Sequence, residues 1–202
     1  MIRTKTGVLP RDRSEIMKNS RNRILKITTT AVMIALTCVL TAVVSIPTPT
    51  KGYLNLGDCA VLLSGWLLGP VLGPVAGGVG AALADLMVGY PVYVPGTLVI
   101  KGVMAFIAAL APCRFSENGK KHPGIGFILC AVFAEAFMTA GYWLYEAVVI
   151  GEGFAAAFAG VSGNVVQGCA GAAGAYFLAG ILRCAELPGT CIAGSDGKGR
   201  IK

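Results

Sequence analysis

The sequence predicts an all-α integral membrane protein, a compact bundle of six transmembrane helices with both chain ends in the cytoplasm. The first observation is composition: of 202 residues, 55% are apolar and 13% are charged, and the mean hydropathy is +0.71. Soluble domains carry about 25% charged residues. The second observation is a series of apolar stretches, and the third is the placement of the basic residues. The high hydrophobicity also excludes a disordered chain.

Six apolar stretches, separated by proline, glycine or charged residues, define the expected helices. They cover about residues 24–46, 57–70, 74–89, 96–112, 124–150 and 154–183. The separators are typical of turns. The first stretch is longer than the apolar core of a secretory signal, so it is expected to be retained. The predicted division of the chain is a basic cytoplasmic tail (1–23), a membrane domain (24–185) and a polar cytoplasmic tail (186–202).

The basic residues give the orientation. Fifteen of the 17 lysines and arginines lie in the N-terminal region up to Lys26, in the loop at 113–123 or at the C-terminal end. Lys51 is expected on the opposite face, and Lys101 falls inside a span. Because basic residues stay in the cytoplasm, both chain ends are expected inside. The net charge of +7 therefore indicates topology and contact with lipid headgroups, and no nucleic-acid binding.

The sequence lacks the residue patterns that metal binding, disulfide frameworks and common catalytic reactions require. The seven cysteines are scattered singly and His122 is the only histidine, which argues against a metal site and a disulfide framework. No GxxxxGK[ST], HExxH or GxSxG pattern occurs. We therefore expect neither ATP hydrolysis in the P-loop manner nor catalysis by the metalloprotease or serine-hydrolase motifs. We therefore expect no catalytic residue and no cofactor.

Polar residues inside the spans are the candidates for function, because an ionisable group is costly there. On the fifth predicted helix Glu135, Tyr142 and Glu146 are spaced i, i+7 and i+11, which is one helical face. On the sixth, Asn164 and Gln167 share a stripe with glycines. Both stripes are predicted to face one cavity that is open to the outside. The alternative is structural: the amides bond neighbouring helices, and Lys101 pairs with Asp85 or Glu146.

Several motifs resemble the substrate-binding S components of energy-coupling factor (ECF) vitamin transporters. They occur in the family's order at 51–58 (KGYLNLGD), 68–70 (LGP), 77–86 (GGVGAALADL), 89–90 (GY), 100–102 (IKG), 141–146 (GYWLYE) and 163–168 (GNVVQG). The resemblance covers about residues 28–183, nearly all of the membrane portion, and is closest to the riboflavin and hydroxymethylpyrimidine group.

The resemblance implies a function and a site. S components bind a vitamin or precursor from outside, here of the riboflavin, hydroxymethylpyrimidine, pantothenate or pyridoxine class. They deliver it through a module of one transmembrane coupling protein and two ATPases, in the plasma membrane of a prokaryote. Ala31-x-x-x-Ala35 matches the pattern that contacts the coupling protein. The implied substrate-binding residues are Asn55, Asp58, Lys101, Tyr142, Glu146, Asn164 and Gln167, with Asp85 and Glu135 in second rank.

Two other functions remain open on the sequence. The chain could be a stand-alone secondary transporter of a small polar metabolite, in which Asp85 and Glu135 carry protons. It could also be an intramembrane enzyme that uses Glu135 and Glu146 as an acid–base pair, although no nucleophile or metal set accompanies them.

Overall fold

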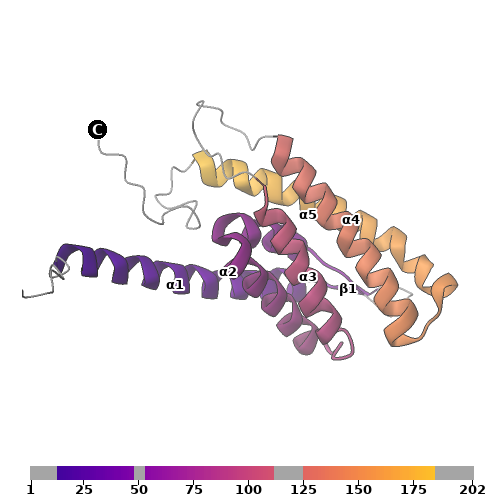
Figure 1. Cartoon of the computed structure of the whole chain (residues 1–202). Helices are drawn as coiled ribbons and strands as arrows, with labels where there is room; N and C mark the ends of the chain where they lie inside the picture. Colours follow the sequence, from indigo (N-terminus) through magenta and orange to yellow (C-terminus); the bar gives the residue numbers. More distant parts are fainter. Residues whose placement is uncertain (1–12, 48–52, 112–124, 185–202) are drawn as a thin grey trace, which may run out of the picture.

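The computed structural model describes residues 13–47, 53–111 and 125–184, and these residues form an all-helical bundle with one small hairpin (Figure 1). Four of the helical elements are long and apolar enough to cross a membrane, and α3 is shorter. A helical membrane protein is therefore confirmed. In chain order the elements are α1 (Arg13–Val43), β1 (Ile46–Pro47), β2 (Tyr53–Leu54), α2 (Gly57–Val88), α3 (Val94–Ala109), α4 (Ile125–Leu144), the π-helical segment η1 (Tyr145–Ile150) and α5 (Phe154–Cys184).

The number of helices differs from the prediction, because α2 covers both of the helices expected at 57–70 and 74–89. The helical backbone is interrupted once within it, at Gly69, where φ is 79° and ψ is −172°. A positive φ is open to glycine at little cost, and Pro70 cannot continue the hydrogen-bond ladder of a helix. Five α-helices are therefore described, and one of them contains a sharp break at the expected hinge.

The two halves of α2 fold back on each other at this break. The Ser64 hydroxyl donates to the carbonyl of Gly73 at 3.2 Å. A Cβ at Gly77 would lie 3.1 Å from Val61 Cγ1, so contacts between the halves run antiparallel. Asp58 near the start of α2 and Asp85 near its end consequently come to the same end of the bundle.

Helix α1 begins earlier than predicted and packs mainly on α2. It starts at Arg13, inside the expected tail, because residues 13–43 contain no glycine or proline to interrupt a helix. Its first turns project away from the other helices (Figure 1). The rest of the expected tails, the basic loop at 113–123, Lys51 and His122 lie outside the described residues.

The bundle has a buried interior of small and apolar side chains and an apolar outer surface. Met104, Ala105 and Met138 are fully buried. Large apolar side chains such as Val71, Met87 and Phe158 remain more than 60% exposed. An outer surface of that kind is suited to lipid, because a soluble protein rarely exposes large apolar patches.

Glycine lets α2 and α3 approach closely, and this gives the first prediction. A Cβ at Gly78 would lie 2.7 Å from the carbonyl oxygen of Leu98 in α3. Gly78→Ala should therefore force the helices apart and lower the free energy of unfolding by about 1–3 kcal/mol, measured as a lower thermal midpoint in detergent. Gly180→Ala is the matched control, because nothing lies within 4 Å of a Cβ there. Equal midpoints for both variants would contradict this packing.

Candidate ligand-binding site

A polar cavity lies where the ends of several helices meet. Thr41 of α1, Tyr53 and Leu54 of β2, and Thr97 of α3 contribute to its wall. The space that admits a water-sized sphere is about 40 Å³, so the cavity is nearly filled by its own side chains. Seven residues predicted from the sequence also line it: Asn55, Asp85, Lys101, Tyr142, Glu146, Asn164 and Gln167.

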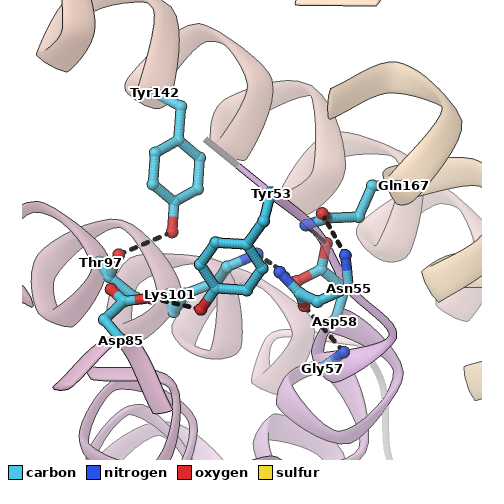
Figure 2. A network of polar contacts seen from close by, with 9 residues as sticks. All are labelled: Tyr53, Asn55, Gly57, Asp58, Asp85, Thr97, Lys101, Tyr142 and Gln167. Carbon is cyan, nitrogen blue, oxygen red and sulfur yellow. Dashed lines mark hydrogen bonds and ion pairs between the residues drawn. The ribbon is translucent and has the colours of Figure 1, made fainter. Parts of the chain in front are cut away.

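A buried ion pair stands at the centre of the site (Figure 2). Lys101 of α3 donates to Asp58 Oδ1 at the start of α2, and the side chains are 2% and 0% exposed. Gln167 of α5 donates from Nε2 to Asp58 Oδ2 at 2.8 Å. Both oxygens of Asp58 are thus engaged, and three helices are held together by one carboxylate. Asp58 supports Lys101 and Gln167 from behind the cavity, since it does not line the wall itself.

The same amide ties the hairpin segment to α5. The backbone N–H of Asn55 donates to Gln167 Oε1 at 2.9 Å, and Asn55 Oδ1 accepts from the N–H of Gly57 at 2.9 Å. β1 and β2 pair antiparallel, with Ile46 opposite Leu54 and Pro47 opposite Tyr53. The hairpin that places Tyr53 and Asn55 over the cavity is therefore fixed by a side chain from the far helix.

Two tyrosines outside the helices each donate to a buried carboxyl group. Tyr53 donates to Asp85 Oδ1 at 2.5 Å, and Tyr93 donates to Glu146 Oε1 at 3.4 Å. Burial, and then the hydrogen bond to Asp85, raises the pKa of Tyr53. Burial, and then the charge of Glu146, raises the pKa of Tyr93. Both hydroxyls therefore stay protonated and act as donors.

Tyr142 joins the same wall from α4. Its hydroxyl donates to Thr97 Oγ1 at 3.0 Å, and Lys101 Nζ lies 5.4 Å from the centre of its ring. A cation over an aromatic face is attracted to it. The ammonium of Lys101 is thus held by Asp58 on one side and by the Tyr142 ring on another.

Glu146 reaches the cavity from a π-helical turn. Residues Tyr145–Ile150 form η1, which extends α4 and ends at Gly151 with φ 81°. π-Turns inside helices occur frequently at functional sites. The Tyr145 hydroxyl anchors this turn by donating to the carbonyl of Val92 at 2.7 Å. Even spacing along one helical face could not predict this local change of pitch.

Glu135 lies elsewhere, contrary to the expectation that its stripe faces a single cavity. With Trp143 it lines a separate, mainly apolar groove between α4 and α5, about 490 Å³ in volume. Glu135 comes seven positions before Tyr142 in α4, about 10 Å along the helix axis. It therefore lies farther from the end of the bundle that holds the polar cavity. A Cβ at Gly171 would be 2.6 Å from Asp58 Cβ and 2.9 Å from Glu135 Oε1. Both side chains therefore pack closely against this glycine.

The residues that sequence reasoning missed are Tyr53, Tyr93, Thr41 and Thr97. Tyr53 lies within the KGYLNLGD motif, and that motif was its one signal. Nothing in the sequence distinguishes Thr97 from an ordinary residue of an apolar helix. No group of three or more metal-binding side chains occurs in the described part of the chain, and Cys38, Cys59, Cys130 and Cys169 are free thiols.

The sequence of the chain matches a known protein family. The family model of the ECF-type riboflavin transporter S component matches residues 21–183. The chain belongs to this family. It is also similar to a protein of Pyrococcus woesei described as an uncharacterized protein in the gap 3′ region. The two are 39% identical over 120 residues, which cover 59% of this chain and 76% of that protein.

Family membership settles the broad class. The chain is an S component of the ECF vitamin-transporter type and a membrane transport protein, not an enzyme. With four apolar helices of spanning length, it crosses the membrane several times. The intramembrane acid–base pair of Glu135 and Glu146 is therefore set aside, and the two carboxyl groups also line different cavities.

The buried pair gives the second prediction. Lys101→Met should leave Asp58 as an uncompensated buried charge and cost about 3–5 kcal/mol of stability. The double variant Lys101→Met with Asp58→Asn should recover much of that loss, because the amide is neutral and still accepts a hydrogen bond from Gln167. Thermal unfolding in detergent measures both. A double variant no more stable than Lys101→Met would contradict a charge-pairing role.

Proposed function

We propose that this chain captures a vitamin or vitamin precursor outside the plasma membrane of a prokaryote and delivers it inward with an ATP-driven coupling module. The candidate classes are riboflavin, hydroxymethylpyrimidine, pantothenate and pyridoxine. The module is one transmembrane coupling protein with two ATPase subunits. The observation that carries the proposal is the polar cavity, lined by side chains from every described helix and from the hairpin, in a chain of this family.

The proposed orientation places both chain ends in the cytoplasm and the cavity toward the outside. The charge distribution supports it, since fifteen of 17 basic residues fall on the proposed inner side. Within the bundle, α2 enters and leaves at the cavity end, because Asp58 and Asp85 both belong to that site. Counting the two antiparallel halves of α2 separately gives six spans, and with six spans both termini lie on one side.

Ligand entry in this proposal requires the hairpin to move. The free space of about 40 Å³ is far below the 300–1,000 Å³ typical of small-molecule sites. Tyr53, Leu54 and Asn55 fill the cavity from the hairpin side, and they are attached to the helices chiefly by the Tyr53–Asp85 and Asn55–Gln167 hydrogen bonds. Breaking these two contacts would make room for a vitamin-sized molecule.

The primary experiment is mass spectrometry of small molecules released from the purified full chain, followed by binding titration of the released compound. We expect one stoichiometric vitamin-like compound that binds with a dissociation constant from nanomolar to low micromolar. Uptake of that compound by cells should require the ATPase subunits. Uptake without them that follows the proton gradient would overturn the coupling proposal and favour the secondary transporter with Asp85 and Glu135.

The proposed docking face on α1 gives a separate prediction. Ala31 and Ala35 are both exposed, on the side of α1 away from the buried Met33 and Thr37. Larger side chains there have room in the isolated S component, so Ala31→Leu and Ala35→Leu should leave ligand affinity unchanged while reducing uptake at least tenfold. Ala156→Leu, at an exposed alanine of α5, is the control. Normal uptake by both α1 variants would remove this face from the interface.

A further inference from the structure

The groove between α4 and α5 is separate from the polar cavity, and no described residue lines both. Its volume of about 490 Å³ falls within the range of about 300–1,000 Å³ that is typical of small-molecule sites. Val132, Phe158 and Val165 in its wall are also exposed on the apolar outer surface of the bundle. In a membrane-spanning chain the groove therefore opens toward lipid.

Glu135 is the only charged side chain among the described residues that line this groove. It is 7% exposed, and both of its carboxyl oxygens are buried without a hydrogen-bond partner in the described part of the chain. Lys101 of α3 forms its ion pair with Asp58 and not with Glu135. Buried polar atoms normally have hydrogen-bond partners, and an exception requires an explanation.

Two glycines of α5 leave room for this carboxyl group. A Cβ would lie 3.1 Å from Glu135 Oε2 at Gly168, and 2.9 Å from Glu135 Oε1 at Gly171. Gly168 is itself part of the groove wall, so the carboxyl group lies at the inner side of the groove, against α5. Rotation about the side-chain bonds of Glu135 would turn its oxygens into the groove that the residue already lines.

The depth of Glu135 restricts what can supply the donors. It comes ten residues after Ile125 at the start of α4 and nine before Leu144 at its end, about 15 Å and about 13 Å along the axis. Because the hydrocarbon core of a bilayer is about 30 Å thick, Glu135 lies near its middle. Phospholipid headgroups lie at the surface, and acyl chains carry no donor. A donor at this depth therefore belongs to an apolar molecule that enters from the lipid phase.

An amine matches this carboxyl group better than an alcohol does. An ammonium group carries three N–H donors, enough for both oxygens of Glu135, whereas an alcohol carries one. Hydrogen bonds between ionised groups are also roughly twice as strong as those between neutral groups. A neutral amine that takes the proton of a protonated Glu135 gives the same ammonium–carboxylate pair. In either case the buried charge is paired, as a charge in apolar surroundings has to be.

The rest of the groove indicates where the apolar body of such a molecule lies. Trp143 comes eight residues after Glu135, about 12 Å along the axis, and lines the same groove. Its indole N–H donates to the carbonyl of Phe154 at 3.2 Å, so the ring is held in place. Ala136 and Ala140 line the groove between Glu135 and Trp143, and their small side chains leave space for an alkyl chain.

We propose that this groove is a second binding site, which takes an apolar amine from the lipid phase, with its ammonium group on Glu135 and its apolar chain extended toward Trp143. The site is separate from the proposed vitamin site, so failure of this proposal would leave the proposed function untouched.

The test uses Trp143 as the reporter. The chain has two tryptophans, and the other, Trp66, is buried against Phe127. The purified full chain in phosphatidylcholine vesicles is titrated with 10-bromodecylamine and with 10-bromodecanol, whose bromine quenches tryptophan fluorescence from the end of the chain away from the polar group. We expect saturable quenching by the amine, with half-saturation at a concentration in the bilayer at least tenfold lower than for the alcohol. Unbrominated decylamine should reverse it.

Variants assign the effect to the carboxyl group and to the groove. Glu135→Gln removes the charge and keeps the shape, so half-saturation by the amine should need a tenfold or higher concentration, while that by the alcohol stays within twofold. Ala140→Leu keeps the carboxyl group but fills the groove, and should abolish saturable quenching by the amine. Glu152→Gln is the control, because it removes a carboxyl group that lines neither cavity. A circular-dichroism spectrum and a thermal midpoint check that each variant is folded.

Several outcomes would overturn the proposal. Equal half-saturation by the amine and the alcohol would mean that the groove accepts any alkyl chain, as a lipid site does. Quenching by the amine that never saturates would mean that the probe acts from the bilayer alone. A folded Glu135→Gln variant with unchanged affinity for the amine would remove the carboxyl group from the site. If that variant does not fold, unchanged quenching in Ala140→Leu would contradict the proposal instead.

Discussion

The ion pair between Asp58 and Lys101 is the interaction on which the rest of the site depends. It joins the start of α2 to the middle of α3, and the second oxygen of Asp58 binds Gln167 of α5. Gln167 in turn holds the backbone of Asn55, which follows the hairpin. A buried pair of this kind contributes little net stability, because desolvation offsets the attraction, but it is expensive to break. Its value here is positional: it fixes how three helices and the hairpin meet.

This pair also changes what the cavity presents to a ligand. A lysine inside a span suggests an anion-binding site when it is considered alone. In the structure its charge is balanced from behind, and the Tyr142 ring covers another side. Among the described residues that line the cavity, the buried side-chain atoms without a hydrogen-bond partner are Thr41 Oγ1, Asp85 Oδ2 and Glu146 Oε2. The character of the site is thus set by Asp58, a residue that does not line it.

Much of this could be predicted from the sequence, for identifiable physical reasons. Helices follow from long apolar stretches, and the hinge at Gly69-Pro70 follows from backbone chemistry that permits little else. Asn55, Lys101, Glu146 and Gln167 stood out because polar groups are rare in such spans. Tyr53, Tyr93 and Thr97 did not, because tyrosine and threonine are unremarkable in apolar helices and at their ends. The position of Glu135 outside the cavity that Tyr142 lines could not be predicted in this way. Helical periodicity predicts which face of a helix a residue lies on, but not how far along the helix a cavity extends.

The cavity and the proposed docking face are linked by one continuous helix. Thr41 lines the cavity from α1, and the hairpin follows directly after the end of α1 at Val43. Ala35 lies six residues earlier than Thr41, about 9 Å along the axis at 1.5 Å per residue. No glycine or proline interrupts the helix between them, so the segment has no hinge at which a displacement could be absorbed. Under the proposed function, a ligand that displaces the hairpin would therefore act on the end of the same continuous helix that carries Ala31 and Ala35. Loading of the cavity would then be coupled through α1 to the proposed docking face.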